Sequence, residues 1–160
     1  MKKIVTKVLI RAALVFICFG FFNSLLAQDG PFRMENRWKK TYINNQSGPL
    51  ALGAIQPGWW SAMWTLEKIG STNYVRIKNR WKGTYIHNQT GLTIGTIQPG
   101  WWSAMWTLEP VQGTNYVRIK NRWKGTYLNN QNGTLSLGTI QTGWWSAMWT
   151  VGLSAVNTSG

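Results

Sequence analysis

Short runs of alternating apolar and polar residues follow one another along most of this chain. In residues 74–79, Val75 and Ile77 fall on one face and polar side chains on the other, which predicts a half-buried β-strand. Three further short runs follow, separated by turn-forming stretches rich in Asn, Gly and Pro: residues 84–87, 92–98 and 105–109. No stretch keeps a helical period for three turns, so the pattern predicts an all-β chain.

This unit of four strands occurs three times. The tryptophans that open the copies, Trp38, Trp81 and Trp123, are 43 and then 42 residues apart. The same eight-residue sequence, Gly-Trp-Trp-Ser-Ala-Met-Trp-Thr, occurs in the last part of each copy, at residues 58–65, 100–107 and 143–150. Three copies are too few for a propeller of about 4–8 blades. An open solenoid needs distinct capping repeats, and none of the three copies has that character. One closed barrel with pseudo-threefold symmetry is therefore expected, with repeats at about residues 32–73, 74–115 and 116–151.

Each copy contains the order Tyr-x-Arg-Ile-x-Asn-Arg-Trp-Lys-Gly-Thr-Tyr, or a variant of it, then a glycine turn and a short strand. It closes with x-x-Trp-x-Leu-Glu in the first two copies and with Trp-Thr-Val-Gly in the third. This order resembles the repeat of the ricin B-type β-trefoil lectins over about residues 32–151. The resemblance implies an all-β β-trefoil of three repeats of about 42 residues, with four strands each, and a sugar-binding function.

The resemblance is weaker at the motifs that hold sugar in that family. The tryptophan of its Q-x-W motif is kept at Trp64, Trp106 and Trp149, but alanine replaces the glutamine in every copy, at Ala62, Ala104 and Ala147. The family's sugar-binding aspartate falls near Asn44, His87 and Asn129, none of which is an aspartate. The resemblance therefore predicts the fold more strongly than it predicts a galactose-type site.

Residues 1–27 have the pattern of a cleaved secretory signal. Four basic residues precede an apolar run, residues 12–22, which is too short to span a bilayer, and Ala27 offers a small residue for cleavage. The only cysteine, Cys18, lies in this segment. The mature chain, residues 28–160, is expected to be one β-trefoil domain without a disulfide or a membrane span, secreted or periplasmic.

The composition argues against an enzyme. The mature chain keeps one histidine, four acidic residues and no cysteine, which leaves little for acid–base, nucleophilic or metal chemistry, and no cofactor is expected. The carboxylates of Glu67 and Glu109 are repeat mates and are expected to lie far apart around the barrel.

The charge balance points to an anionic partner. The chain has 17 basic and 4 acidic residues, and four of the basic ones lie in the expected signal. Export favours an acidic or phosphorylated glycan over nucleic acid. Alternation predicts rows of four cations about 6.6 Å apart on one strand face, either as a polyanion-binding stripe or as an ordinary solvated face. These rows are Arg76, Lys78, Arg80 and Lys82, repeated as Arg118, Lys120, Arg122 and Lys124.

The tryptophans fall into two classes. Trp64, Trp106 and Trp149 share the strand parity of core residues and are expected inside the barrel. The adjacent pairs that follow each turn should point in opposite directions, since neighbours on an extended segment do so. By this parity the exposed members are Trp59, Trp101 and Trp144.

An exposed indole packs against the C–H face of a sugar while nearby amides bond its hydroxyls. The residues expected to supply these polar contacts are Asn44, Asn45, Gln46, His87, Asn88, Gln89, Asn129, Asn130 and Gln131. The sequence thus favours a non-catalytic, lectin-like module that binds glycans weakly at up to three sites. Two alternatives stay open: a protein-interaction or scaffold module whose tryptophans only cap the barrel and whose Asn-Gln pairs only shape turns, and polyanion capture by the basic stripe.

Overall fold

The structure, a computed structural model, describes residues 30–153. The expected signal segment, residues 1–27, lies outside the described residues. The first repeat contains β1 (Phe32–Asn36), β2 (Tyr42–Asn44), β3 (Ala51–Gly53), the 3-10 turn η1 (Trp60–Ala62) and β4 (Trp64–Lys68). The second contains β5 (Val75–Asn79), β6 (Tyr85–His87), β7 (Thr93–Gly95), η2 (Trp102–Ala104) and β8 (Trp106–Pro110). The third contains β9 (Val117–Asn121), β10 (Tyr127–Asn129), β11 (Ser136–Gly138), η3 (Trp145–Ala147) and β12 (Trp149–Leu153).

The expected all-β repeat of four strands is confirmed, with one local difference. In β5, Val75 and Ile77 are buried while Arg76 and Lys78 are half-exposed, as the alternation predicts. The third strand is shorter than expected, at Thr93–Gly95 instead of residues 92–98, and the chain then enters a 3-10 turn. No helix within the described residues is long and apolar enough to cross a bilayer.

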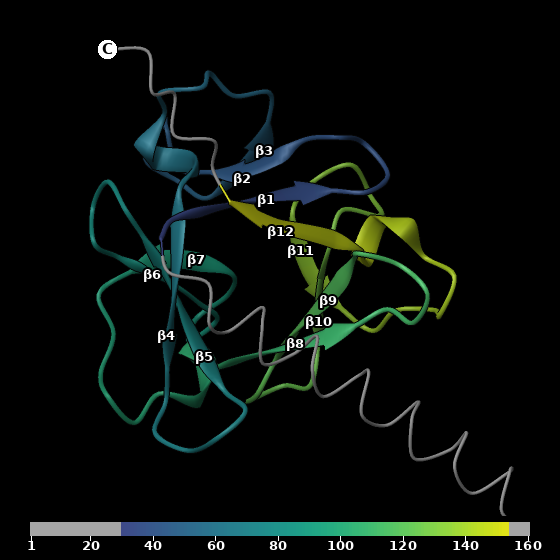
Figure 1. The fold of residues 1–160 in the computed structure, drawn as a ribbon. Helices are drawn as coiled ribbons and strands as arrows, with labels where there is room; N and C mark the ends of the chain where they lie inside the picture. Colours follow the sequence, from purple (N-terminus) through teal and green to yellow (C-terminus); the bar gives the residue numbers. More distant parts are fainter. Residues whose placement is uncertain (1–29, 154–160) are drawn as a thin grey trace, which may run out of the picture.

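The barrel is a closed ring of strands in which the first and the last strand meet. Antiparallel pairing runs from β1 to β4, β5, β8, β9 and β12, and β12 pairs again with β1, with Met34 opposite Val151. Figure 1 shows β1 and β12 side by side. Each repeat adds one hairpin outside this ring: β2–β3, β6–β7 and β10–β11. This is the closed, pseudo-threefold barrel expected from the repeats.

The last tryptophan of each repeat lies in the core, as predicted. Trp64, Trp106 and Trp149 are completely buried, together with apolar residues of all three repeats. Their indole Nε1 atoms donate hydrogen bonds, each 3.0 Å long, to backbone carbonyls of the hairpins. The acceptors are Ile43, Ile86 and Leu128. Because a buried indole N–H needs a partner, these bonds let tryptophan fill the core and also fix each hairpin to the barrel.

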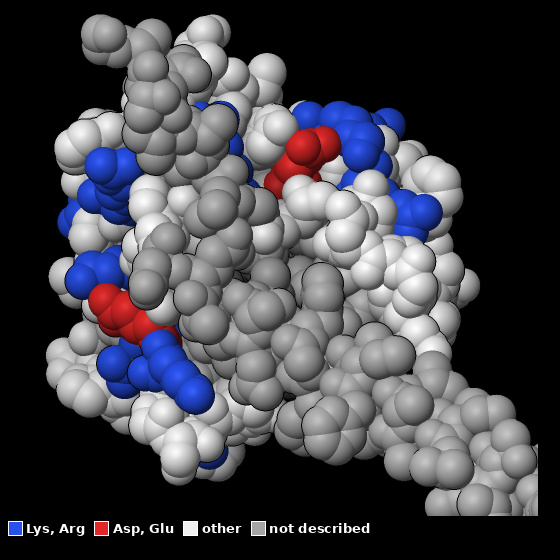
Figure 2. Space-filling view, in the orientation of Figure 1, with Lys and Arg blue, Asp and Glu red and all other residues white. Residues whose placement is uncertain are grey.

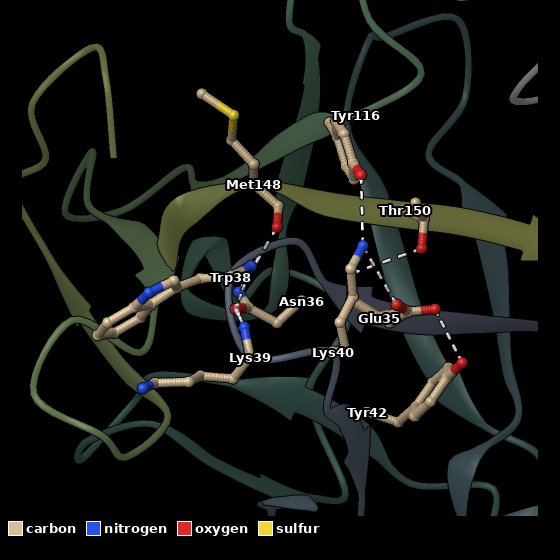
Figure 3. A network of polar contacts seen from close by, with 9 residues as sticks. All are labelled: Glu35, Asn36, Trp38, Lys39, Lys40, Tyr42, Tyr116, Met148 and Thr150. Atoms are coloured by element: carbon tan, nitrogen blue, oxygen red, sulfur yellow. Dashed lines mark hydrogen bonds and ion pairs between the residues drawn. The ribbon is translucent and has the colours of Figure 1, made fainter. Parts of the chain in front are cut away.

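A buried asparagine joins each repeat to the one before it. Asn79 ends β5, and its Nδ2 donates to the carbonyl of Ser61 in η1 at 3.0 Å. Its Oδ1 accepts from the backbone N–H groups of Trp81 and Lys82 at 3.0 and 3.1 Å, so the strand ends in a tight turn. Asn36 bonds Ser146 in the same way where the ring closes. Its side chain also holds the turn of Trp38 and Lys39, as Figure 3 shows.

Candidate functional site

Each tryptophan pair leaves one indole strongly exposed, but it is the second member and not the first. Trp60, Trp102 and Trp145 expose 52–53% of their surface, whereas Trp59, Trp101 and Trp144 are half-buried. The parity argument is wrong here because a 3-10 turn begins at the second tryptophan of each pair, and strand alternation stops there.

The exposed tryptophans lie at junctions between repeats and form open grooves. One groove, of about 440 Å³, is lined by Gln46, Gly58, Trp59, Trp60 and Ser61 of the first repeat and by Trp81 of the second. Another, of about 470 Å³, is lined by the corresponding residues of the third repeat and by Trp38 of the first: Gln131, Gly143, Trp144, Trp145 and Ser146. We call these the inter-repeat grooves. The sequence places equivalent residues, Gln89, Trp101, Trp102 and Trp123, at the third junction.

Sequence reasoning missed one tryptophan in the wall of each observed groove. The opening tryptophans, Trp38, Trp81 and Trp123, are 42–43% exposed. Trp81 and Trp38 line a groove together with the tryptophan pair of a neighbouring repeat and not with the pair of their own. The available signal was the recurring Arg-Trp-Lys segment, which puts an indole between two cations in a turn where burial is hard to achieve.

A glutamine forms the polar edge of each groove. Ser61 Oγ donates to Gln46 Oε1 at 2.6 Å, and Ser103–Gln89 and Ser146–Gln131 make the same bond. This contact fixes the amide oxygen, while the amide nitrogen of Gln46 makes no hydrogen bond to another described residue. Each edge therefore presents a positioned N–H donor beside the indoles.

The other predicted polar residues lie in the interior, contrary to the expectation that they face a ligand. Buried residues in this set are Asn44, Asn45, His87, Asn88, Asn129 and Asn130, while Gln46, Gln89 and Gln131 are exposed. Asn44 illustrates the reason: its Nδ2 donates to the carbonyl of Tyr42 at 3.3 Å and its Oδ1 accepts from the N–H of Gln46 at 3.1 Å. Such side-chain bonds to the nearby backbone shape the turn.

His87 takes the place of this asparagine in the second repeat. Its Nδ1 accepts from the backbone N–H of Gln89 at 3.3 Å, and its ring meets Trp101 edge-on, with centroids 5.6 Å apart. A Cβ at Gly95 would lie 3.1 Å from His87 Nε2, so the ring packs tightly against the neighbouring strand. Burial lowers the pKa of His87 below its ordinary value, which favours a neutral ring behind the groove.

The predicted row of four cations does not form. Arg76 and Lys78 do share the outer face of β5, but Arg76 donates to the carbonyl of Pro99 at 2.6 Å and Lys78 pairs with Glu67 at 3.0 Å. The strand ends at Asn79, so Arg80 and Lys82 lie in the turn that follows. Lys120 and Arg122 are separated in the same way by the end of β9. In Figure 2 the blue side chains accordingly form separate groups, and the red ones lie directly beside some of them.

The carboxylates of residues 30–153 are held on the outside of the barrel. Glu35 accepts a hydrogen bond from Tyr42 at 2.8 Å and pairs with Lys40 at 3.6 Å, as Figure 3 shows. The bond to Glu35 raises the pKa of Tyr42. Glu67 and Glu109 repeat this arrangement with tyrosine and lysine partners of their own. No group of residues within 30–153 has the ligands for a metal ion.

Comparison with known proteins supports the architecture. No protein-family model and no curated protein matches this sequence. ThreeFoil, a designed 3-fold symmetric protein, matches with a TM-score of 0.68 at 16% identity, over 78% of this chain and 99% of its own. The fold is a β-trefoil. SeviL, whose structure is bound to asialo-GM1 saccharide, matches this trefoil with a TM-score of 0.65 at 18% identity, over 78% of this chain and 97% of its own.

A higher identity occurs with part of an enzyme. The GlcNAcα1-4Gal releasing endo-β-galactosidase of Clostridium perfringens matches with a TM-score of 0.69 at 27% identity, over 78% of this chain. The match covers 32% of the enzyme chain, so this trefoil spans about a third of the enzyme's length.

Proposed function

We propose that this chain is a secreted or periplasmic carbohydrate-binding module, lectin-like and non-catalytic, that holds glycans in the inter-repeat grooves. The observation that carries the proposal is the groove wall. In one groove, Trp59, Trp60 and Trp81 come together around an open volume of about 440 Å³. Pockets lined by aromatic rings with a few fixed polar groups are typical of small-molecule sites, and flat rings suit the C–H faces of pyranoses.

Two further observations support this proposal. The amide of Gln46, positioned by Ser61, offers a donor to a sugar hydroxyl at the edge of the indoles. Among trefoils of similar structure, SeviL is bound to a saccharide, and the partly matching clostridial enzyme acts on a galactoside. Glycans, acidic or phosphorylated ones among them, are accordingly the proposed partners.

Binding at one groove should be weak, because the grooves are open and present few polar groups. Three equivalent grooves around one barrel could together gain roughly 10²–10⁴ in avidity on a repetitive glycan, provided that its spacing allows simultaneous contact. The module would then bind polymers or dense glycan surfaces rather than single free sugars.

A glycan array of neutral and acidic saccharides tests the proposal. We expect hits that vanish in the triple variant Trp60→Ala/Trp102→Ala/Trp145→Ala, whose indoles are exposed and contribute little to the core. The triple variant must keep the circular dichroism spectrum and melting midpoint of the parent for the comparison to count. An empty array, together with a cell-surface protein captured through the same tryptophans, would favour the protein-interaction alternative instead.

A further inference from the structure

The exposed indoles that line the inter-repeat grooves each have a cationic side chain stacked on them. At the junction of the first two repeats, the guanidinium of Arg80 lies 4.2 Å from the ring centre of Trp60, and Lys82 Nζ lies 4.1 Å from that of Trp81. Neither cation is among the residues that line this groove, whereas both indoles are. The cations therefore lie against the indoles away from the groove space.

All three junctions repeat this arrangement. Where the ring closes, Arg37 and Lys39 lie 4.0 Å from Trp145 and Trp38. At the remaining junction the corresponding distances are also 4.0 Å, for Arg122 on Trp102 and Lys124 on Trp123. Six exposed indoles thus each have a cation of their own.

Two of the three arginines are held between two aromatic rings. Arg37 also lies 4.6 Å from the ring of Tyr116, so its guanidinium is sandwiched between a tyrosine and a tryptophan, and its Nη1 contacts Met148 Sδ at 3.2 Å. Arg122 is sandwiched in the same way by Tyr74 and Trp102. A positioned charge loses little side-chain entropy when a ligand arrives, so it contributes more to binding than a mobile one.

No carboxylate of the described chain neutralises these cations. The ion pairs within residues 30–153 join Glu35, Glu67 and Glu109 to other lysines, namely Lys40, Lys78 and Lys120. Each acidic side chain is also bonded to a tyrosine. The positive field at each groove is therefore left for a ligand to satisfy.

A cation on one face of an indole changes what its other face prefers. The face of an aromatic ring is electron-rich, and this attracts both cations and the partly positive C–H groups of a sugar. When one face is taken by a guanidinium or ammonium, electron density is drawn away from the face that lines the groove. A neutral sugar then gains less from stacking, while a sugar with a negative group gains Coulomb attraction from two nearby charges.

We infer that the inter-repeat grooves select saccharides that carry a carboxylate or sulfate group over neutral ones. The inference rests on the proposed function, since it requires a sugar in the groove. Lys39, Lys82 and Lys124 are the specificity-determining residues, because each is exposed and stacks only on its own tryptophan. The sugar ring lies on the groove faces of the indoles, and its anionic substituent is attracted by the charges of the lysines on the opposite faces.

The test compares a neutral tetrasaccharide, its uronate counterpart and its sulfated counterpart by titration calorimetry, at low and at high salt. The groove variant Lys39→Gln/Lys82→Gln/Lys124→Gln is set against the charge-matched control Lys40→Gln/Lys68→Gln/Lys120→Gln, whose lysines stack on none of the six exposed indoles. We expect the parent to prefer an anionic form, and the groove variant to lose roughly three- to tenfold in affinity for that form alone. The control variant should stay within about twofold of the parent, and high salt should weaken anionic binding.

The outcomes separate this inference from the proposed function. If the neutral sugar binds as tightly as the anionic ones and the groove variant behaves like the parent, the inference is overturned and carbohydrate binding stands. If the control variant loses as much affinity as the groove variant, only net charge acts, and the grooves are not the selective element. If none of the three saccharides binds the parent, both the inference and the proposed function fail.

Discussion

Replacing Asn79 by alanine tests whether one buried side chain holds a groove together. Asn79 exposes 1% of its surface and makes three close hydrogen bonds: to the carbonyl of Ser61 and from the N–H groups of Trp81 and Lys82. A hydrogen bond contributes about 0.5–1.5 kcal/mol net, and a buried group left unpaired costs about 1–3 kcal/mol. In the variant the buried carbonyl of Ser61 keeps the backbone N–H of Asn45 as a donor at 3.2 Å, and the two N–H groups lie in a surface turn that water can reach, so the cost is mainly that of three lost hydrogen bonds.

We therefore expect Asn79→Ala to lower the free energy of unfolding by about 2–4 kcal/mol. At roughly 4 °C per kcal/mol for a domain of this size, the melting midpoint should fall by about 8–16 °C. Urea unfolding followed by circular dichroism measures the free energy, and a thermal scan measures the midpoint.

A matched variant separates the bonds that Asn79 accepts within its turn from the bond that it donates to the preceding repeat. Asn79→Asp keeps the oxygen that accepts from Trp81 and Lys82 but loses the donor to Ser61, so the turn should survive while the junction weakens. The alanine variant should also lose one glycan site in a calorimetric titration, because Trp81 leaves the groove wall. A loss below about 0.5 kcal/mol in Asn79→Ala, within the range of ordinary surface substitutions, would refute the reasoning.

Three further predictions concern the core, the buried histidine and the groove. Trp106→Ala should cost about 3–5 kcal/mol in urea unfolding, because a completely buried indole leaves a cavity and an unpaired carbonyl. Burial lowers the folded-state pKa of His87 and so favours its neutral form. The contribution of this residue to the free energy of unfolding is therefore fully present above the unfolded pKa of about 6.5. The free energy of unfolding should then fall as pH drops from that value toward the folded pKa. The fall should be smaller in His87→Asn, which has the residue of the other repeats. Equal slopes of the free energy of unfolding against pH in the two proteins, from pH 7 to 5, would contradict this. Trp60→Ala should change stability by less than about 1 kcal/mol but weaken glycan binding by roughly five- to tenfold in calorimetry.

The architecture could be predicted because its signals are local and repeated. Alternation along residues 74–79 shows which side chains enter the barrel, and the structure confirms this for Val75 and Ile77. The number of copies argues against a propeller and the lack of distinct capping repeats against an open solenoid, and the burial of Trp64 follows from its strand parity. These inferences need only the order of residues along each strand and the repetition of the unit along the chain.

The site could be predicted only in part, since it depends on where strands stop and on contacts between repeats. Strand parity failed at Trp59 and Trp60 because the backbone changes to a 3-10 turn there. It failed again after Asn79, whose side chain ends β5 and breaks the expected row of cations. Trp81 joins a groove of the preceding repeat, and no pattern within one repeat shows that contact.

The sequence also shows that an amide is present without showing which way it points. Asn44 and Gln46 are two residues apart, yet Asn44 is buried in bonds to the backbone and Gln46 reaches the groove. A polar residue after a short strand serves equally well as a turn-former or as a ligand contact, and only the geometry of the turn decides between them.

The most direct test of the central claim is a crystal structure of this protein with a saccharide identified on the array. The account predicts sugar density between Trp60 and Trp81 and at the equivalent junctions, with a ring stacked on an indole and a hydroxyl within hydrogen-bond distance of Gln46. Sugar bound elsewhere on the trefoil, with the inter-repeat grooves empty at saturating concentration, would contradict it.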